Sequence, residues 1–320
     1  MQSPGPLPVI LDVDTGVDDA LAILLALRSP ALQVLGITCV TGNVPVGQVV
    51  RNTRRVLSAL GDPCTPVLRG AERPLRESPH YSVTVHGPDG LGGLDLPDPE
   101  GAPREGKAVD WLRDTLMAAA EPVLILALGP ATNLAALLEA APEVKPKIRR
   151  IMMMGGAFAA PGNAGPVAEY NIRVDPEAAQ QLFSSGAPLT LYTLDVFRAV
   201  AVRREQLARL EASGAAGDLA AQLLAYMMDR FNSDQTSIGD AGVVASAILP
   251  EALHTERYAV QVELEGRLTR GQTVVDRRTP LVKMLNAYWG EAAPPNLEVS
   301  VSVDGDRLSE LFSATIEGKL

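Results

Sequence analysis

Cysteine, histidine and aromatic residues are scarce in this chain of 320 residues. It contains two cysteines and three histidines, and aromatic residues make up 4% of the sequence. Cys39 and Cys64 lie in separate apolar segments without metal-ligand spacing, so we expect buried, reduced thiols rather than a disulfide or a zinc site. Because aromatic rings are few, aliphatic side chains must fill most of the core.

Net positive charge and long apolar runs are also missing. The 28 basic and 38 acidic residues give a formal charge of −10, which repels phosphate backbones and argues against a nucleic-acid partner. No segment approaches the roughly 20 apolar residues that cross a bilayer. The first six residues include no basic residue ahead of an apolar stretch, so they do not resemble a signal peptide. We therefore expect a cytoplasmic protein without membrane contact.

Apolar residues are abundant and follow an alternating strand and helix pattern. A hydrophobic fraction of 47% and a charged fraction of 21% are typical of a folded protein. Runs such as Leu35–Val40 are apolar on both faces, which favours strands of a parallel sheet covered by helices on each side. We predict an α/β fold with an open, mostly parallel, Rossmann-like sheet of at least six strands. The predicted strands are 9–13, 32–40, 66–68, 123–128, 151–154 and 189–194, and the predicted helices are 20–28, 46–60, 131–141 and 176–184.

Two segments depart from this pattern. Between about Glu72 and Lys107 the sequence is rich in Pro, Gly, Asp and Ser, and such a long connection is often a functional lid. The polar stretch 232–239 predicts a second flexible segment, which would form a wall of the binding site opposite or beside the lid. Residues 258–264 and 272–275 alternate like antiparallel strands, and 296–320 predicts a strand and a closing helix. Because no repeat or linker interrupts the chain, we expect residues 1–320 to form a single domain.

Four carboxylates follow the first predicted strand within eight positions: Asp12, Asp14, Asp18 and Asp19. In an open α/β sheet, a turn from strand to helix faces the crevice where ligands bind. Carboxylates so close together raise one another's pKa unless a cation neutralises them, and their hard oxygen atoms suit Ca²⁺ or Mg²⁺. The simpler alternative is that Asp18 and Asp19 cap the helix while Asp12 is solvated.

One family with a similar first motif is the haloacid-dehalogenase-type phosphohydrolases. Their first motif is DxDxT, and Gly239-Asp240 resembles the late motif that supplies another metal ligand in that family. Their threonine stands four positions after the first aspartate, where this chain has Gly16 after Asp12. The adjacent pair Asp18-Asp19 also has no counterpart there. A phosphohydrolase of this type therefore remains an alternative.

The inosine-uridine nucleoside hydrolase family resembles the chain more extensively. Its signature DxDxGxDDAxA matches from Asp12 to Ala22. Five further blocks resemble that family in the same order, namely 41–43, 129–133, 153–156, 168–171 with 175–179, and 269–276. The resemblance covers nearly the whole chain and implies a nucleoside hydrolase fold that cleaves ribonucleosides to ribose and free nucleobase. It also implies a role in purine or pyrimidine salvage and assembly as a homodimer or homotetramer.

The same resemblance implies roles for individual residues. Ca²⁺ would be held by Asp14, Asp19, Asp240 and the main-chain carbonyl of Leu128. A Ca²⁺-bound water, with Asp14 as its general base, would attack C1′ from the face opposite the departing base. The residues that would bind the ribose are Asp18, Asn43, Met154, Glu169, Asn171 and Asp240.

The sequence departs from the family at the position before the late aspartate. Many members carry a histidine or tryptophan there to activate or stack on the base, whereas this chain has Gly239. His86, in the predicted lid, matches a loop histidine of many relatives and is the candidate group for activating the leaving base, although it could equally be an exposed turn residue. Tyr81, Tyr226 and Phe231 could stack on the base or pack the lid and helix.

Base preference is left open by the sequence, because the segments that would contact the base match the family least. His80 and His254 have no matching context, so we expect them at the surface or at the edge of the core. Gly239 also leaves a third alternative, which is a nucleoside- or ribose-binding protein without turnover.

Overall fold

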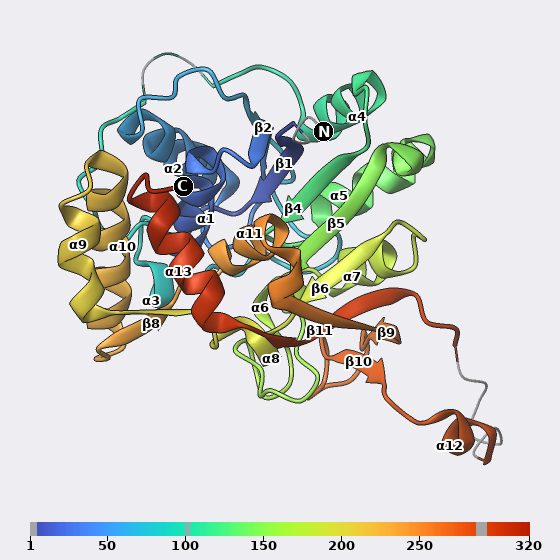
Figure 1. The fold of residues 1–320 in the computed structure, drawn as a ribbon. Helices are drawn as coiled ribbons and strands as arrows, with labels where there is room; N and C mark the ends of the chain where they lie inside the picture. The colour runs from blue at the N-terminus through green and yellow to red at the C-terminus, as the bar shows by residue number, and fades with distance from the viewer. Residues whose placement is uncertain (1–4, 100, 102, 286–292) are drawn as a thin grey trace.

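The computed structural model describes residues 5–99, 101, 103–285 and 293–320, which surround one nine-stranded sheet (Figure 1). The strand order is β10-β9-β11-β6-β5-β4-β1-β2-β3, and β7 and β8 form a separate two-stranded ribbon. The strands are β1 (Leu7–Val13), β2 (Leu32–Cys39), β3 (Val67–Arg69), β4 (Val123–Ala127), β5 (Ile148–Met154), β6 (Leu189–Tyr192), β7 (Ala201–Arg203), β8 (Gln235–Ser237), β9 (Leu253–Val262), β10 (Thr273–Asp276) and β11 (Leu297–Val303).

The sheet is parallel from β11 to β3 and antiparallel only at one edge. Neighbouring strands in the series β11, β6, β5, β4, β1, β2 and β3 pair in parallel, whereas β9 is antiparallel to β11 and β10 is antiparallel to β9. The prediction of an open, mostly parallel α/β sheet is confirmed, as is the antiparallel pair near the end of the chain. The ribbon of β7 and β8 was not predicted, because each strand has three residues and no apolar run.

Helices cover both faces of the sheet. The longer ones are α1 (Val17–Arg28), α2 (Val46–Ala59), α4 (Ala108–Ala118), α5 (Thr132–Ala140), α7 (Pro176–Phe183), α10 (Ala215–Arg230), α11 (Ala241–Ile248) and α13 (Gly305–Ile316). The shorter ones are α3 (Val83–His86), α6 (Tyr170–Val174), α8 (Leu194–Phe197), α9 (Leu207–Glu211), α12 (Pro280–Leu285) and the 3₁₀ turns Pro142–Lys147, Arg204–Gln206 and Pro250–Ala252.

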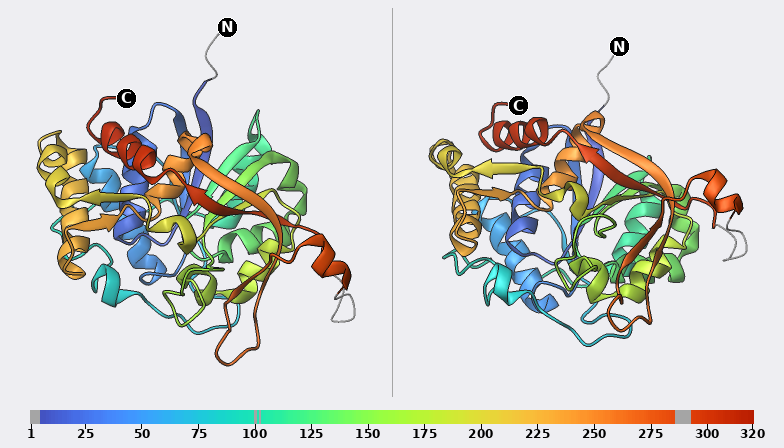
Figure 2. Two further views of the ribbon diagram at one scale, coloured as in Figure 1. Left: turned by 60° about the horizontal axis from the view of Figure 1, so that its bottom comes forward. Right: turned by 90° about the horizontal axis from the view of Figure 1, so that it is seen from below.

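Two apolar cores lie on opposite faces of the sheet. One includes side chains of α1, α2, α10, α11 and α13, and the other includes side chains of α4, α5 and α7. Figure 2 shows the blue and gold helices on one side of the sheet and the green helices on the other. Because both faces are covered, β4 and β6 bury every residue, and β1 and β5 bury all of their residues at the carboxyl end.

Helix α1 is apolar almost all round, which is typical of a helix buried on every side. Its residues from Asp19 to Ala26 are buried, and it packs against α10, α11 and α13. β1 precedes this helix and lies between β2 and β4, so the strand order reverses beside β1. The carboxyl ends of β1 and β4 therefore border the crevice in which open α/β sheets bind ligands.

The long connection predicted as a lid runs from about Glu72 to Lys107 and contains only the short helix α3 among its described residues. Asn52 of α2 ties this segment to the acidic loop, because its Nδ2 donates to the carbonyls of Thr15 at 3.1 Å and Asp89 at 2.8 Å. The flexibility of this segment and of residues 232–239 stays a prediction.

The two cysteines are free, but only Cys39 is buried. The prediction that both thiols are buried is therefore wrong for Cys64. This residue lies in the turn between α2 and β3, where the Asp62 carboxylate accepts hydrogen bonds from the backbone N–H groups of Cys64 and Thr65. Such a turn lies at the surface and leaves the Cys64 side chain in solvent.

No helix in the described part of the chain has both the length and the apolar character needed to cross a membrane. Residues 1–4, part of the N-terminal segment that does not resemble a signal peptide, lie outside the described residues.

Candidate active site

The acidic loop is folded around the carboxylate of Asp19. Asp19 Oδ2 accepts from the backbone N–H of Gly16 at 2.9 Å and from Asn43 Nδ2 at 3.3 Å, and Asp19 Oδ1 accepts from the N–H of Asp14 at 3.3 Å. These bonds close the first turn of α1 onto the end of β1, as an acidic residue in this position of a helix commonly does. Asp19 is fully buried, so the capping interpretation of this residue holds alongside its predicted role as a metal ligand.

Asp14 is held from the neighbouring loop. Its Oδ2 accepts from the backbone N–H of Asn43 at 2.7 Å. The chain passes so close to this carboxylate that a Cβ at Gly42 would overlap Asp14 Oδ2, and one at Gly129 would lie 3.0 Å from Asp14 Oδ1. Burial first, and then the charge of Asp19, raise the pKa of Asp14 well above its ordinary value. The loops after β2 and β4 therefore fix a carboxylate that binds a proton readily.

Asp12 joins three elements below the loop. Its Oδ1 accepts from Thr38 Oγ1 of β2 at 2.5 Å and from Asn133 Nδ2 of α5 at 2.7 Å. The side chain is fully buried, which contradicts the alternative of a solvated Asp12. Burial raises its pKa to about 6. Asp12 thus supports the strand end from beneath and does not line the cavity.

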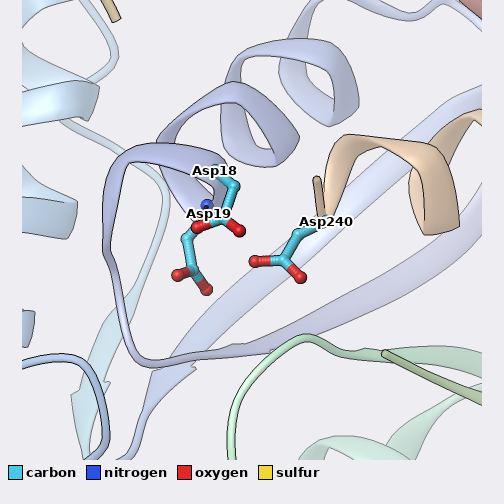
Figure 3. Close-up of side chains that lie close together, drawn as sticks. All are labelled: Asp18, Asp19 and Asp240. Atoms are coloured by element: carbon cyan, nitrogen blue, oxygen red, sulfur yellow. Dashed lines mark hydrogen bonds between the residues drawn. The ribbon is translucent and has the colours of Figure 1, made fainter. Parts of the chain in front are cut away.

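Three carboxylates converge at the N-terminal ends of α1 and α11. Oxygen atoms of Asp18, Asp19 and Asp240 lie within 4.8 Å of one another, and Figure 3 shows the three side chains pointing to a common space. Burial, followed by the charge of Asp18, raises the pKa of Asp19 to about 8 and that of Asp240 well above its ordinary value. No lysine or arginine pairs with these carboxylates among the described residues. Hard, negatively charged oxygen atoms without a counterion suit a divalent cation.

The two other predicted ligands of the cation lie beside this group. Asp14 follows β1 in the same loop, although its oxygens are not among those within 4.8 Å of one another. The carbonyl of Leu128 follows β4 and accepts from Asn171 Nδ2 at 2.7 Å. A carbonyl oxygen has two lone pairs, so this bond leaves one for a cation. Asp14 and Leu128 thus line the same cavity as Asp18 and Asp240, and their role as ligands of a cation stays a prediction.

Helix α6 carries two of the residues predicted to bind the ribose. Glu169 is its N-cap, and its carboxylate accepts from the backbone N–H groups of Asn171 at 2.9 Å, Ile172 at 3.1 Å and Gly156 at 3.2 Å. Burial nevertheless raises the pKa of Glu169 to about 7. Asn171 Nδ2 also donates to the carbonyl of Met154 at 3.1 Å, so α6 is joined to the ends of β4 and β5.

His86 is the last residue of α3 and is buried against the start of α1. Its Nδ1 accepts from the backbone N–H of Val17 at 3.1 Å and lies 3.8 Å from Asp18 Oδ1. An Nδ1 that accepts a hydrogen bond leaves the proton of a neutral imidazole on Nε2. Burial lowers the pKa of His86, so the ring is neutral near pH 7. The alternative of an exposed turn residue is therefore wrong.

Gly239 has a backbone conformation that other residues rarely adopt. Its φ is +58°, and a Cβ added there would overlap the Cβ of Asp18 and lie 2.8 Å from Asp18 Oδ2. The absence of a side chain thus follows from the close approach of this turn to α1. The leaving base cannot receive a proton from this position.

These residues line one cavity of about 660 Å³. Its lining includes every predicted site residue except Asp19, which is buried behind the surface. Of the three aromatic residues considered for stacking, Phe231 lines the cavity, whereas Tyr81 and Tyr226 do not. His80 and His254 are exposed, as predicted. A cavity of this size, lined by many polar side chains together with a smaller number of apolar ones, fits a small polar molecule such as a nucleoside.

Comparisons with known proteins identify the family. Residues 9–310 match the family model described as inosine-uridine preferring nucleoside hydrolase. The chain is 38% identical over 317 residues to the pyrimidine-specific ribonucleoside hydrolase RihA of Salmonella gallinarum, covering 97% of this chain and 98% of that protein. The chain belongs to the inosine-uridine preferring nucleoside hydrolase family.

Solved structures of nucleoside hydrolases have the same fold. The purine-preferring ribonucleoside hydrolase from Gardnerella vaginalis is 32% identical, with a TM-score of 0.87 over 97% of this chain and 98% of that one. The plant nucleoside hydrolase PpNRh1 is 31% identical, with a TM-score of 0.87 over 97% of this chain and 99% of that one. The predicted nucleoside hydrolase fold and enzyme class are confirmed, and the dehalogenase-type alternative receives no support.

Sequence reasoning missed part of the cavity of this nucleoside hydrolase. Phe197 and Arg198 follow β6 and line the cavity together with Gln235 and Ser237 of β8. Their position after a central strand was an available signal, because the carboxyl ends of all parallel strands meet at the same edge. No motif singled out these residues, and β8 has too few residues to be predicted.

Proposed function

We propose that this nucleoside hydrolase cleaves ribonucleosides to ribose and free base with Ca²⁺ as its cofactor and Asp14 as the general base. The observation that carries the proposal is the group of Asp18, Asp19 and Asp240 carboxylate oxygens within 4.8 Å of one another, beside a cavity that Asp14 and Leu128 also line. Carboxylate and carbonyl oxygens are the ligands that Ca²⁺ prefers.

Asp14, Asp19, Asp240 and the Leu128 carbonyl are the proposed ligands of the cation. The donor set fits, because the carboxylates are buried and crowded and have raised pKa values that a bound cation would lower again. When bound, Ca²⁺ would supply positive charge that offsets these carboxylates and polarises the attacking water. Asp18 is assigned to the ribose, although it lies close enough to contribute an oxygen atom to the cation.

Asp14 would take a proton from the attacking water. Its Oδ2 is occupied by the N–H of Asn43, which orients the carboxylate and leaves Oδ1 as the basic atom. The water oxygen forms a bond with C1′ while the bond from C1′ to the base nitrogen breaks, through an oxocarbenium-like transition state. One proton of the water passes to Asp14, and the electron pair of the broken bond leaves with the base.

The ribose would lie between the acidic loop and α6. Its hydroxyl groups are donors, and the carboxylates of Asp18, Glu169 and Asp240 with the side-chain oxygens of Asn43 and Asn171 are acceptors on the cavity wall. Met154 would contact the sugar through apolar atoms. A 2′-deoxyriboside would leave buried polar groups without partners and should therefore be a poor substrate.

His86 would donate a hydrogen bond to the base from Nε2. Because Nδ1 is committed to the N–H of Val17 and the ring is neutral, His86 orients the base and does not supply an imidazolium proton. This assignment makes His86 a binding group and leaves the charge of the departing base to be stabilised by another group.

The test is a panel of purine and pyrimidine ribonucleosides assayed for free ribose, with 2′-deoxyribosides and an aryl phosphate as comparisons. We expect ribose release from ribonucleosides and a loss on the order of 10⁴-fold in kcat/KM for the matching 2′-deoxyribosides. Tight binding of ribonucleosides without ribose release would support the non-catalytic alternative. Turnover of the aryl phosphate with Mg²⁺ would support a phosphohydrolase instead.

Several expectations from the sequence belong to the same proposal. We propose a single domain over residues 1–320, assembly as a homodimer or homotetramer, a cytoplasmic location without nucleic-acid or membrane partners, and a role in purine or pyrimidine salvage. The family match over residues 9–310 supports the single domain and the ribonucleoside substrate.

A further inference from the structure

One wall of the cavity is formed by α8, β7 and β8. β7 and β8 pair antiparallel, with Ala201 opposite Ser237, and the N–H of Ile238 donates to the carbonyl of Val200 at 3.0 Å. These bonds join the segment that contains Arg198 to the residue directly before Gly239. Arg198 lines the cavity and follows α8 by one residue. Its long side chain therefore starts close to the space that Gly239 leaves without a side chain.

Arg198 brings positive charge to an acidic cavity. Asp14, Asp18, Glu169 and Asp240 all line the cavity, and within the described ranges Arg198 is the one arginine or lysine that does so. Its guanidinium makes no hydrogen bond or ion pair in the part of the chain that the structure describes, whereas nearby Arg204 is bonded to Asp229. An arginine keeps its charge at every working pH, so Arg198 offers a permanent cation to a ligand.

The departing base needs such a cation. When the C1′–N bond breaks, its electron pair stays on the base, which becomes negatively charged unless it gains a proton. Gly239 has no side chain, and the neutral ring of His86 is held at Nδ1 by Val17. A guanidinium beside the base would stabilise this charge without transferring a proton, and the base would later take its proton from solvent water.

Given the hydrolysis proposed above, on which this inference rests, we propose that Arg198 is a catalytic residue that contacts the nucleobase and stabilises the negative charge of the departing base. A guanidinium has donors and no acceptor, and its planar fork matches two adjacent acceptors such as O6 and N7 of a 6-oxopurine. It is poorly matched to adenine, in which an amino group replaces O6. Arg198 therefore also selects bases with carbonyl groups over bases with amino groups.

The experiment measures kcat/KM of the wild type, Arg198→Ala and Arg198→Lys with inosine, adenosine and 4-nitrophenyl β-D-ribofuranoside. Nitrophenolate leaves readily without stabilisation, so its riboside reports on the ribose site alone. For Arg198→Ala we expect a loss on the order of 10²-fold with inosine and less than about fivefold with the nitrophenyl riboside. Arg198→Lys keeps the charge but not the fork, so its loss with inosine should be intermediate.

The matched control is Arg203→Ala. Arg203 is exposed on β7, five positions further along the same segment, and does not line the cavity. Arg203→Ala removes one positive charge, as Arg198→Ala does, and should leave kcat/KM unchanged with all three ribosides. The preference for inosine over adenosine should fall in Arg198→Ala and persist in Arg203→Ala.

Three results would overturn the proposal. Equal losses with inosine and the nitrophenyl riboside would show a structural role, and an unchanged rate with inosine would show no role. Inosine 5′-monophosphate is assayed alongside these ribosides, and a loss confined to it would assign Arg198 to a phosphate group. Failure of the proposed function is distinguishable, because the wild type would then release ribose from none of the three ribosides, and the assignment of Arg198 would fall with it.

Discussion

At Gly239 the backbone and a neighbouring side chain both exclude a Cβ. The positive φ disfavours any L-residue, and the turn lies against the Cβ of Asp18 at the start of α1. A histidine or tryptophan at this position would have to displace either α1 or the turn before α11. The local backbone therefore determines that leaving-group chemistry must come from elsewhere in the cavity.

Gly239→Ala should lower both stability and activity, because the new Cβ collides with Asp18. Gly186→Ala is the control, since Gly186 also has a positive φ, of +76°, but has no atom within 4 Å of an added Cβ. Both variants incur the backbone penalty of about 1 kcal/mol, and only the first displaces Asp18. The melting temperature and kcat/KM should both fall further in Gly239→Ala than in Gly186→Ala. Equal losses would contradict this account of Gly239.

Asp14→Asn should lower kcat by about 10²- to 10⁴-fold, because an amide cannot accept the proton of the attacking water. The amide keeps the size of the carboxylate, so the fold should be retained, as circular dichroism can show. Asp234→Asn is a suitable control, since Asp234 is an exposed loop residue paired with Arg204 at 3.3 Å. A kcat for Asp14→Asn within tenfold of the wild type would rule out Asp14 as the base.

Among the elements, α3 is positioned by α10 rather than by its own four residues. Tyr226 Oη donates to the carbonyl of Val85 at 3.2 Å, and Arg230 Nε donates to the carbonyl of Thr84 at 2.7 Å. A helix this short cannot hold its shape alone, so these bonds to its carbonyl groups fix His86 over the start of α1. These contacts hold the predicted lid against α10 beside the cavity.

Arg230→Gln should loosen α3 and lower kcat/KM about three- to fivefold, corresponding to the loss of one hydrogen bond of about 1 kcal/mol. Arg307→Gln is the control, because it removes an exposed ion pair to Glu251 far from α3. The measurement is kcat/KM of the wild type and both variants in the steady state with one ribonucleoside. A decrease of the same size in Arg307→Gln would mean that removal of surface charge, and not the position of α3, lowers the rate.

The elements that could be predicted from the sequence are those with a strong local pattern. Strands β1 to β6 and helices α1, α2, α5 and α7 have apolar patterns, and periodicity located them within a few residues, whereas α3, α4 and α6 were not predicted. Cys64 was misplaced because its apolar neighbours suggested burial, whereas the Asp62 turn places it at the surface. β7 and β8 have three residues each and depend on pairing with one another, which no local pattern reveals.

Across the whole molecule, the site is assembled from segments more than 200 positions apart, such as Asp19 and Asp240. The acidic cluster at the end of β1 could be predicted from charge spacing and from the position of strand ends in α/β sheets. Its distant partners came only from the family resemblance, because nothing local in Asp240 or Asn171 indicates what it meets in the folded chain. Arg198 was missed for the same reason.

The metal-free protein should lose stability as the pH rises. Burial raises the pKa of Asp12 to about 6 and that of Glu169 to about 7, from ordinary values of 3.8 and 4.5. Above these ordinary values the unfolded chain releases protons that the folded chain retains, so the free energy of unfolding falls between about pH 4 and pH 7. We expect the melting temperature of the chelator-treated protein to fall by about 5 °C or more from pH 5 to pH 8.

Added Ca²⁺ should raise the melting temperature more at pH 8 than at pH 5, because ligand carboxylates must lose their protons to bind a cation. Asp240→Asn removes one proposed ligand and should reduce this difference. A melting temperature that responds equally to Ca²⁺ at both pH values would contradict the location of the cation among these buried carboxylates.

The central claim is that the acidic cluster catalyses ribose release with a bound cation. It is tested most directly by measuring free ribose from a ribonucleoside with chelator-treated enzyme, before and after Ca²⁺ is added back. The account predicts that the chelator lowers the rate at least about 10²-fold, that Ca²⁺ restores it in the wild type, and that Asp240→Asn needs far more Ca²⁺. A rate that survives the chelator unchanged would contradict the account.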